Sequence, residues 1–403
     1  MKGLTIALIH NLKPVAKPAD LPADYYSECD SQKTVNSIAM ALRKGGHTVL
    51  PVEGDQRLPE WFKENAVDLA FNIAEGFHGE AREARIPALL ELLDIPHTGS
   101  GVLALALAMN KAKSKQMFKM AGVPTPNFQL FGHPNDPMDK RLHFPLIVKP
   151  NCEGSAKGIW ASSVVRDEVA LRTQVERVFK AYAQEVLVEE YIDGVELTVG
   201  ILGTDQVLPV LEIDFTDCVP SGEFFYSWRM KEFQGNKKLH LTPRFWCPAR
   251  LNPQGAQAVQ AVALKSAKAL GVRDVARVDI RLSLDGIPYV LEVNPLPGLD
   301  PEESNLPLMA QAAGMSYEAL IHRMVGLAME RSVQRYRSFH PLSHVTSPKP
   351  QTPRRRVLPD SKEKATGSPG HPAVAPRALR PVGPALRRKE ARKDDFKEED
   401  LGR

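Results

Sequence analysis

The first hundred residues alternate between short apolar runs and stretches in which apolar residues recur at helical spacing. Strands are predicted at 4–9, 47–52 and 67–73, with a helix at 34–42, a short helix between the second and third strands, and a helix at 84–93. The helix at 34–42 is followed by Gly45-Gly46, a typical stop signal. This βαβαβα order predicts a small parallel-sheet domain that ends near residue 105.

The pattern beyond residue 105 is less regular and divides into two blocks. The first block predicts helices at 103–109 and 111–120, strands at 144–150 and 159–165, and a helix at 167–182. The second block predicts strands at 186–192, 196–203 and 207–213, a helix at 254–270, two more strands, and a helix from 317 to about 334. We therefore expect an α/β (α+β) fold in which a parallel-sheet domain precedes a larger mixed part.

Residues 275–295 alternate strictly between apolar and polar positions around Asp285-Gly286, a dipeptide typical of two-residue hairpin turns. With these two residues as the turn, Asp279 lies opposite Glu292 and Arg277 lies opposite Asn294, all on one face. The other face collects apolar residues that can pack on a core: Ala276, Val278, Ile280, Leu282, Tyr289, Leu291 and Val293.

The polar face of this predicted hairpin places two carboxylates directly opposite each other, where like charges destabilise a sheet. A divalent cation between Asp279 and Glu292 would remove the repulsion. Together with the amide oxygen of Asn294 they form a set of hard oxygen ligands, which suits Mg²⁺ or Mn²⁺. The alternative is the solvated face of an amphipathic hairpin, and the nucleotide features described next favour the metal.

Two further predicted strands carry residues suited to a nucleotide. The strand at 144–150 contains Lys149 and leads into the small-residue loop 151–158, whose backbone N–H groups can bind phosphate. The loop lacks the G-x-x-x-x-G-K-[ST] order of a Walker loop. The strand at 186–192 carries Glu189 and Glu190, and Glu196 follows a turn; such acids can accept hydrogen bonds from an adenine amino group and ribose hydroxyls.

The net charge of +4 does not indicate a nucleic-acid partner once it is divided along the chain. Residues 341–403 contain 15 Lys or Arg, 8 Asp or Glu and 10 Pro, a net charge of +7, which leaves −3 for the preceding 340 residues. With one aromatic residue, Phe396, this tail cannot bury enough apolar surface to fold, so we expect it to be disordered. Its Arg/Lys runs could contact phosphate or anionic lipid, but a solvated tail without a specific partner is the favoured interpretation.

The cysteine usage and the hydropathy favour a protein of the reducing cytoplasm. The four cysteines are scattered, which disfavours a disulfide framework or a zinc site. The sequence shows no long apolar run and no secretory leader, so we expect no membrane insertion.

The motifs for the nucleotide and the metal, taken in their order along the chain, resemble those of the ATP-grasp superfamily. Within it, they resemble the D-alanine–D-alanine ligase family. The resemblance covers about residues 3–325. It rests on Lys111, Val148-Lys149-Pro150, Glu153-Gly154-Ser155, Val188-Glu189-Glu190, Glu196, Lys231, Arg277-x-Asp279 and Glu292-x-Asn294, with Pro96–Val102, Met109-Asn110-Lys111 and Gly314–Tyr317. It implies a Rossmann-like substrate domain at 1–105, an ATP-grasp small lobe at 106–185 and a large lobe with the metal site at 186–335.

The resemblance also implies a role for each matched residue. Lys111 and Lys149 would hold the phosphates of ATP, Lys231 would contact the γ-phosphate, and the Gly154-Ser155 loop would close over them. Glu189, Glu190 and Ile192 would frame the adenine, and Glu196 the ribose. Asp279, Glu292 and Asn294 would hold two Mg²⁺ or Mn²⁺ ions, and Arg277 would stabilise the oxyanion of the tetrahedral intermediate.

The amino-acid positions depart from the family pattern. Glu28 is the candidate for the first ammonium group, with Asp30 as the alternative, and Ser155, Gly298 and Ser304 are candidates for contacts with the substrates. His78, in the altered segment after Gly76, could orient a substrate or have no task. Lys231 is followed by Glu232 and Phe233 where the family usually has tyrosine.

These features predict an ATP-dependent carboxylate–amine ligase that joins two amino acids through an acyl phosphate, with D-alanine as the leading substrate. Such an enzyme belongs to peptidoglycan and cell-wall synthesis, acts on small molecules without nucleic acid, and is expected to be a homodimer. Two alternatives stay open: a ligase of the same fold for other amino acids or a hydroxy acid, and a catalytically silent ATP-binding protein.

Overall fold

A computed structural model describes residues 3–16, 18 and 21–339. These residues belong to the first of two compact units, Met1–Leu342, whereas the second unit is Ser343–Arg403. The predicted disordered tail at 341–403 therefore lies outside the described residues. No helix in the described ranges has both the length and the apolar character needed to cross a membrane.

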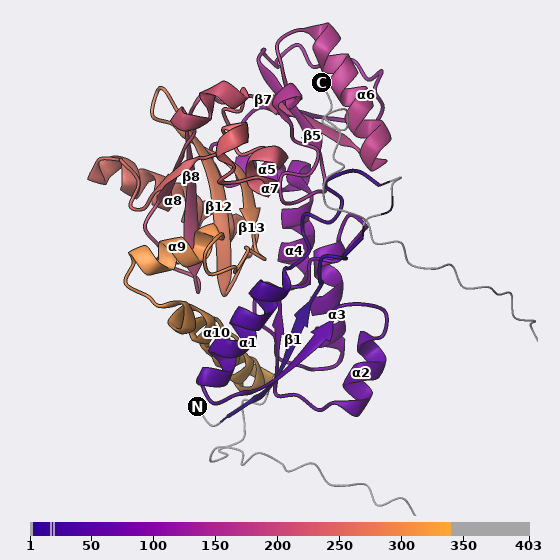
Figure 1. The fold of residues 1–403 in the computed structure, drawn as a ribbon, viewed down its shortest axis with the longest axis vertical. Helices are drawn as coiled ribbons and strands as arrows, with labels where there is room; N and C mark the ends of the chain where they lie inside the picture. The colour runs from indigo at the N-terminus through magenta and orange to yellow at the C-terminus, as the bar shows by residue number, and fades with distance from the viewer. Residues whose placement is uncertain (1–2, 17, 19–20, 340–403) are drawn as a thin grey trace, which may run out of the picture. The chain divides into compact units, whose positions relative to one another are not determined.

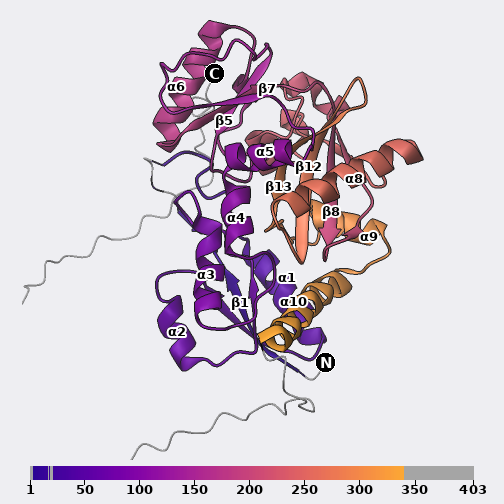
Figure 2. The same ribbon diagram turned by 180° about the vertical axis from the view of Figure 1, so that it is seen from behind.

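The N-terminal part is built on a three-stranded parallel sheet, which confirms the predicted parallel arrangement. Its strands, in the spatial order β2-β1-β3, are β1 (Thr5–His10), β2 (Thr48–Glu53) and β3 (Leu69–Asn72). The helices of this part are α1 (Gln32–Lys44), α2 (Leu58–Glu64) and α3 (Arg85–Leu92), the last preceded by a 3₁₀ turn at Arg82–Ala84. The C-terminal helix α10 (Tyr317–Phe339) lies beside α1 (Figures 1 and 2).

A four-stranded antiparallel sheet forms the smaller of the two remaining layers. Its order is β4-β7-β5-β6, with β4 (Phe128–Phe131), β5 (Leu146–Pro150), β6 (Val164–Val165) and β7 (Val186–Glu190). Helix α6 (Glu168–Tyr182) covers one face of it (Figure 1). Helices α4 (Val102–Met109) and α5 (Lys111–Met120) link this sheet to the N-terminal part.

A six-stranded antiparallel sheet forms the third layer. Its main order is β11-β10-β8-β12-β13, and β9 pairs with β8. The strands are β8 (Gly194–Leu202), β9 (Gln206–Val207), β10 (Leu211–Asp214), β11 (Arg244–Trp246), β12 (Val275–Ser283) and β13 (Pro288–Asn294). Helices α7 (Trp228–Glu232), α8 (Pro253–Ala269) and α9 (Asn305–Ala312) belong to this layer, together with 3₁₀ turns at Thr216–Ser221 and Lys237–Leu239.

Two predicted strands are interrupted or much reduced in the structure. The strand expected at 207–213 is divided into β9 and β10, because Pro209 lies between them and cannot donate to a ladder. The strand expected at 159–165 is reduced to β6, since Ala161–Ser163 forms a 3₁₀ turn. The Ser163 backbone N–H donates to Trp160 O at 2.8 Å and the Trp160 N–H donates to Ser163 Oγ at 3.0 Å, and these bonds close the turn.

The predicted hairpin is present, with the predicted opposed pairs. Asp279 faces Glu292 and Arg277 faces Asn294, but the register shifts between Asp279 and Ile280. This β-bulge makes Val290, rather than Leu291, the core residue, so the prediction that Tyr289 and Leu291 lie on the core face is wrong. The strict alternation in the sequence could not show one extra residue on one strand.

The apolar cores connect two of the three layers and leave the third separate. One core includes Ile6 and Phe71 of the parallel sheet together with Leu202 of the six-stranded sheet and Ile321 of α10. The four-stranded sheet has its own core, centred on residues such as Val148. The site described below lies where these layers meet.

Candidate active site

Two adjoining cavities mark the candidate site, one of about 360 Å³ and one of about 110 Å³. The larger is lined by residues from all three layers, whereas the smaller is lined by residues of the two antiparallel layers and of α5. Seven residues line both: Lys111, Ser155, Tyr226, Lys231, Arg277, Glu292 and Asn305. The smaller cavity holds the residues predicted for the nucleotide: Lys149, Glu189, Glu190, Ile192 and Glu196. The larger cavity holds Glu28, Asp30, Gly298 and Ser304, which were predicted for the amino acids.

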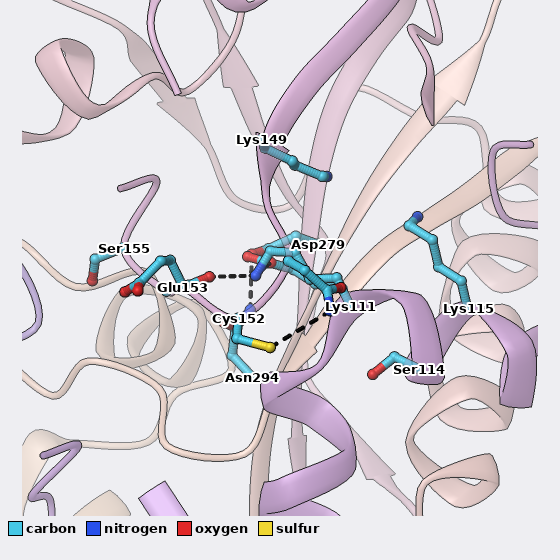
Figure 3. A network of polar contacts seen from close by, with 12 residues as sticks. Lys111, Ser114, Lys115, Lys149, Cys152, Glu153, Ser155, Asp279 and Asn294 are labelled. Carbon is cyan, nitrogen blue, oxygen red and sulfur yellow. Dashed lines mark hydrogen bonds and ion pairs between the residues drawn. The ribbon is translucent and has the colours of Figure 1, made fainter. Parts of the chain in front are cut away.

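Lys149 is fixed in the smaller cavity by a buried carboxylate. Its Nζ lies 2.5 Å from Glu189 Oε1, and Lys115 Nζ lies 2.8 Å from Glu189 Oε2. Burial would raise the pKa of Glu189, but the two lysines outweigh burial and lower it. Burial, with Lys149 nearby, lowers the pKa of Lys115 to about 8. Figure 3 shows Lys115 and Lys149 coming from different elements with their ammonium ends turned toward the same space.

The sequence analysis missed Lys115, although one signal could have identified it. It lies four residues after Lys111 on α5, and residues at this spacing share one helix face. The spacing therefore showed a second lysine on the helix face that carries Lys111, the expected phosphate ligand.

Glu196 is held by an arginine that the sequence analysis also missed. Arg281 donates through Nη1 to Glu196 Oε2 at 3.0 Å, through Nε to Ile192 O at 3.0 Å and through Nη2 to the Tyr191 hydroxyl at 2.9 Å. Arg281 therefore fixes both the expected ribose ligand and the backbone beside the expected adenine site. Its position two residues after Asp279 on β12, on the same strand face, was the available signal.

The polar face of the β12–β13 hairpin forms a connected network. Arg277 donates to both carboxylate oxygens of Asp279, at 2.9 and 2.8 Å, and Asn294 Nδ2 donates to Asp279 Oδ2 at 2.9 Å. Thr198 on β8 donates to Asp279 Oδ1 at 2.7 Å. Glu292 pairs with Lys111 Nζ at 3.0 Å. Figure 3 shows Lys111, Asp279 and Asn294 converging beside Glu153.

The chemistry of this network fits a magnesium ion bound with phosphate. Among the described residues, no three His, Cys, Asp or Glu side chains are grouped closely enough to hold a metal by themselves. Mg²⁺ bound with a nucleotide usually takes one or two carboxylates and completes its shell with phosphate and water oxygens. Asp279 and Glu292, with the Asn294 amide, supply that partial set at the edge of the nucleotide cavity.

The loop after β5 lies across the boundary of the two cavities. Ser155 and Ala156 have φ of 50° and 58°, a left-handed conformation that costs non-glycine residues free energy and is common at functional loops. Glu28 Oε1 accepts from the Gly154 N–H at 2.7 Å and Asp24 Oδ2 accepts from the Gly158 N–H at 2.7 Å. Lys231 Nζ lies 3.1 Å from Ser155 Oγ. The loop is therefore held from the N-terminal part and from α7.

The larger cavity contains acids that the sequence analysis missed. Glu75 and Glu83 line it beside Glu28 and Asp30. The carboxyl ends of parallel strands commonly bind ligands, and Glu75 follows β3 at that edge, which was the available signal. Burial, reinforced by Glu28, Glu83 and Asp30, raises the pKa of Glu75 well above its ordinary value.

Of three further predicted substrate residues, Gly298 and Ser304 line the larger cavity and contact each other, whereas His78 lies outside both cavities. The Ser304 hydroxyl accepts from the Asp300 N–H at 3.0 Å, and a Cβ on Gly298 would lie 2.8 Å from Ser304 Oγ, so glycine permits this close approach. His78 is exposed and is not among the residues that line either cavity.

Comparison with known proteins shows which sequences and folds this chain resembles. Residues 117–326 match a family model described as the D-ala D-ala ligase C-terminus. A D-alanine–D-alanine ligase of Carboxydothermus hydrogenoformans is 35% identical over 311 residues, covering 74% of this chain and 94% of that protein. An uncharacterised protein of Sinorhizobium fredii is 34% identical over 309 residues, covering 74% and 88%. The crystal structure of a D-alanine–D-alanine ligase from Bacillus anthracis complexed with ATP aligns with a TM-score of 0.65 at 27% identity, covering 83% of this chain and 100% of that chain.

Proposed function

The chain belongs to the D-alanine–D-alanine ligase family of ATP-dependent, peptide-bond-forming enzymes, and we propose that its two cavities join two amino acids at their shared boundary. The observation that carries this proposal is the set of residues common to both cavities. Lys111, Lys231, Arg277 and Glu292 line the nucleotide cavity and the larger cavity at once. A phosphoryl group delivered from one cavity can therefore meet a carboxylate held in the other.

The first step transfers the γ-phosphoryl group of ATP to the carboxylate of the first amino acid, which gives an acyl phosphate and ADP. Lys149 and Lys111 hold the phosphates, and Lys231 reaches them from α7 beside Ser155. When bound by Asp279, Glu292 and Asn294, Mg²⁺ or Mn²⁺ supplies neutralisation of the phosphate charge. Burial, with Arg277 nearby, lowers the pKa of Lys231.

The second step is attack by the amine of the second amino acid on the acyl carbon, followed by loss of phosphate. Negative charge develops on the acyl oxygen, and a fixed cation can stabilise it. Arg277 suits this role because both of its contacts with Asp279 fix the plane of the guanidinium group before the reaction.

The substrate pair proposed first is D-alanine with D-alanine, as in the named relatives. A ligase for other amino acids or a hydroxy acid is the second candidate, because the larger cavity carries acids that the family motifs did not predict. A silent ATP-binding protein is disfavoured by the Arg277–Asp279–Asn294 network and by Glu292 beside Lys111.

Phosphate release in the presence of ATP, MgCl₂ and a panel of D- and L-amino acids tests the proposal, with the product identified by mass spectrometry. We expect release that depends on an amino acid and a dipeptide product. Absence of amino-acid-dependent release across the panel, in a protein that still binds ATP, would favour the silent protein. The same preparation, measured by light scattering, tests the proposed homodimer.

A further inference from the structure

We propose that the larger cavity takes an amino acid whose side chain carries a second amino group, recognised by the carboxylates of Glu75 and Glu83. This inference rests on the proposed ligase function and, for the first substrate, favours the second candidate named above, an amino acid other than D-alanine. It is carried by the charge of the cavity and by the absence of cationic partners for several of its acids among the described residues.

Most of the other acids that line the larger cavity already have cationic partners. Glu28 pairs with Arg82 and, at 3.3 Å, with Lys157. Glu292 pairs with Lys111 at 3.0 Å, Glu232 with Lys13 at 2.8 Å, and Asp300 with Lys33 at 3.8 Å. These acids therefore contribute little uncompensated charge to a ligand.

Asp30, Glu75 and Glu83 are different, because no described Lys, Arg or His lies within ion-pair distance of them. Glu83 is only 8% exposed, lines the cavity, and receives no hydrogen bond to its carboxylate from the described residues. Asp30 Oδ2 is buried and likewise has no partner among them. Buried carboxylates of this kind are costly unless a ligand supplies a donor.

The cations of the cavity are too few to compensate these acids. Its lining contains Lys111, Lys231 and Arg277, of which Lys111 is paired with Glu292 and Arg277 with Asp279. Lys231, whose Nζ lies 3.1 Å from Ser155 Oγ and which forms no ion pair with a described residue, is the cation left for three carboxylates. An amino acid with a neutral side chain carries no net charge, because its carboxylate offsets its ammonium group, so only a second amino group adds positive charge to the cavity.

Glu28 is not free to bind the ammonium group of the substrate in place of these acids. Its Oε1 accepts from Arg82 and from the Gly154 N–H, and its Oε2 from Lys157. Glu75 lies next to it: a Cβ added to Gly154 would stand 2.6 Å from Glu28 Oε1 and 3.7 Å from Glu75 Oε2. The carboxylate of Glu75 thus faces the phosphate loop, where the first amino acid has to present its own carboxylate.

The test compares diamino acids with neutral side chains of matched length, with D-alanine as the fixed second substrate. The pairs are 2,4-diaminobutyrate against homoserine and lysine against norleucine, each as both enantiomers. We expect kcat/KM for the diamino acid to exceed that for its neutral partner by about tenfold or more, as for a hydrogen bond between charged groups. Equal or better use of the neutral partners, with dipeptide still formed, overturns this inference and leaves the ligase function standing.

Two variants test whether the proposed carboxylates cause the preference for the diamino acids. Glu75→Gln and Glu83→Gln keep the side-chain shape and should each reduce the preference by about tenfold. Glu80→Gln is the matched control, because Glu80 is exposed on the same segment and lines neither cavity. A preference unchanged in both Glu75→Gln and Glu83→Gln overturns the assignment. No ATP turnover with any amino acid overturns the ligase function itself.

Discussion

Buried charged side chains that pair with one another fix the positions of residues in the smaller cavity. Lys115 is fully buried, Lys149 is 5% exposed, and Glu189, which bridges them, is 1% exposed. Removing one member of such a group leaves an uncompensated buried charge, so each is held by the others. Arg281 does the same for Glu196, and its planar fork reaches three acceptors at once.

Arg281→Lys is expected to weaken ATP binding. A lysine cannot reach Ile192 O, Glu196 and the Tyr191 hydroxyl together, so we expect KM for ATP to rise by about tenfold with a smaller change in kcat. Steady-state kinetics with varied ATP give both constants. Arg323→Lys, at a half-exposed ion pair with Glu330, is the control and should leave KM unchanged. A larger fall in kcat than rise in KM would contradict this positioning role.

Glu292→Gln is expected to remove most turnover while the fold persists. The change deletes one carboxylate of the proposed metal set and the partner of Lys111, and we expect a loss of about hundredfold or more in kcat. Phosphate release and thermal unfolding are measured on the same sample. Wild-type activity in this variant would refute the metal assignment. Glu330→Gln, at the half-exposed pair with Arg323, serves as the control.

The unpaired acids of the larger cavity predict a pH dependence of stability in the substrate-free protein. Burial raises the pKa of Asp30 to about 7, and burial together with Glu28 raises that of Glu83 to about 7. Between their ordinary values near pH 4 and pH 7, the folded chain holds more protons than the unfolded chain. The free energy of unfolding therefore falls as pH rises through this window and levels off above it.

Asp30→Asn checks this dependence, because an amide does not ionise. We expect the variant to be more stable than the wild type at pH 8 by on the order of 1 kcal/mol, with the difference shrinking towards pH 5. Melting temperatures between pH 5 and pH 8 measure it. Parallel curves for the two proteins would show that Asp30 does not titrate differently on folding.

At the scale of elements, the β12–β13 hairpin was the most predictable feature, because its signal is local. The turn dipeptide and the alternation lie within twenty residues, so Asp279 and Glu292 could be paired from the sequence. The bulge beside them could not be predicted from the sequence, because it depends on how β13 packs on the apolar core that contains Ile280 and Val290. Short elements such as β4, β11 and α7 were missed for the same reason: tertiary contacts define them.

Two neighbouring variants test the bulge. Val290 is fully buried, and Val290→Ala should lower the free energy of unfolding by about 2 kcal/mol without a specific effect on ATP. Leu291 lines the nucleotide cavity, so Leu291→Ala should cost less than about 1 kcal/mol and raise KM for ATP. Denaturant unfolding and ATP kinetics separate the two. The reverse pattern would indicate the unbulged register.

At the scale of the molecule, the residues predicted for the nucleotide converge because the fold brings separate elements to the same cavity. Lys111, Lys149, Glu189, Arg277 and Glu292 come from five elements, and the resemblance to a family placed them together. Glu75 and Glu83 were not placed, because they lie on irregular segments after β3 and before α3. Their proximity to Glu28 depends on the packing of the N-terminal part against the loop after β5.

Removing residues 341–403 is expected to leave catalysis unchanged. The last described helix, α10, ends at Phe339, and the site residues all precede it. We expect kcat and KM for ATP within experimental error of the full chain, measured side by side in the same buffer. A loss of more than about threefold would show that the basic tail takes part in the reaction.

The separate core of the four-stranded sheet has a consequence for turnover. The parallel and six-stranded sheets share one apolar core, whereas the four-stranded sheet carries its own. A movement of this layer relative to the other two would therefore not divide an apolar core. Its loop is tethered by a few polar bonds, such as those of the Gly158 N–H to Asp24 and the Trp228 N–H to Ile159 O. Trp160 and Trp228, with ring centroids 4.7 Å apart, lie on the two sides of that boundary, so we expect any such movement during turnover to change the tryptophan fluorescence.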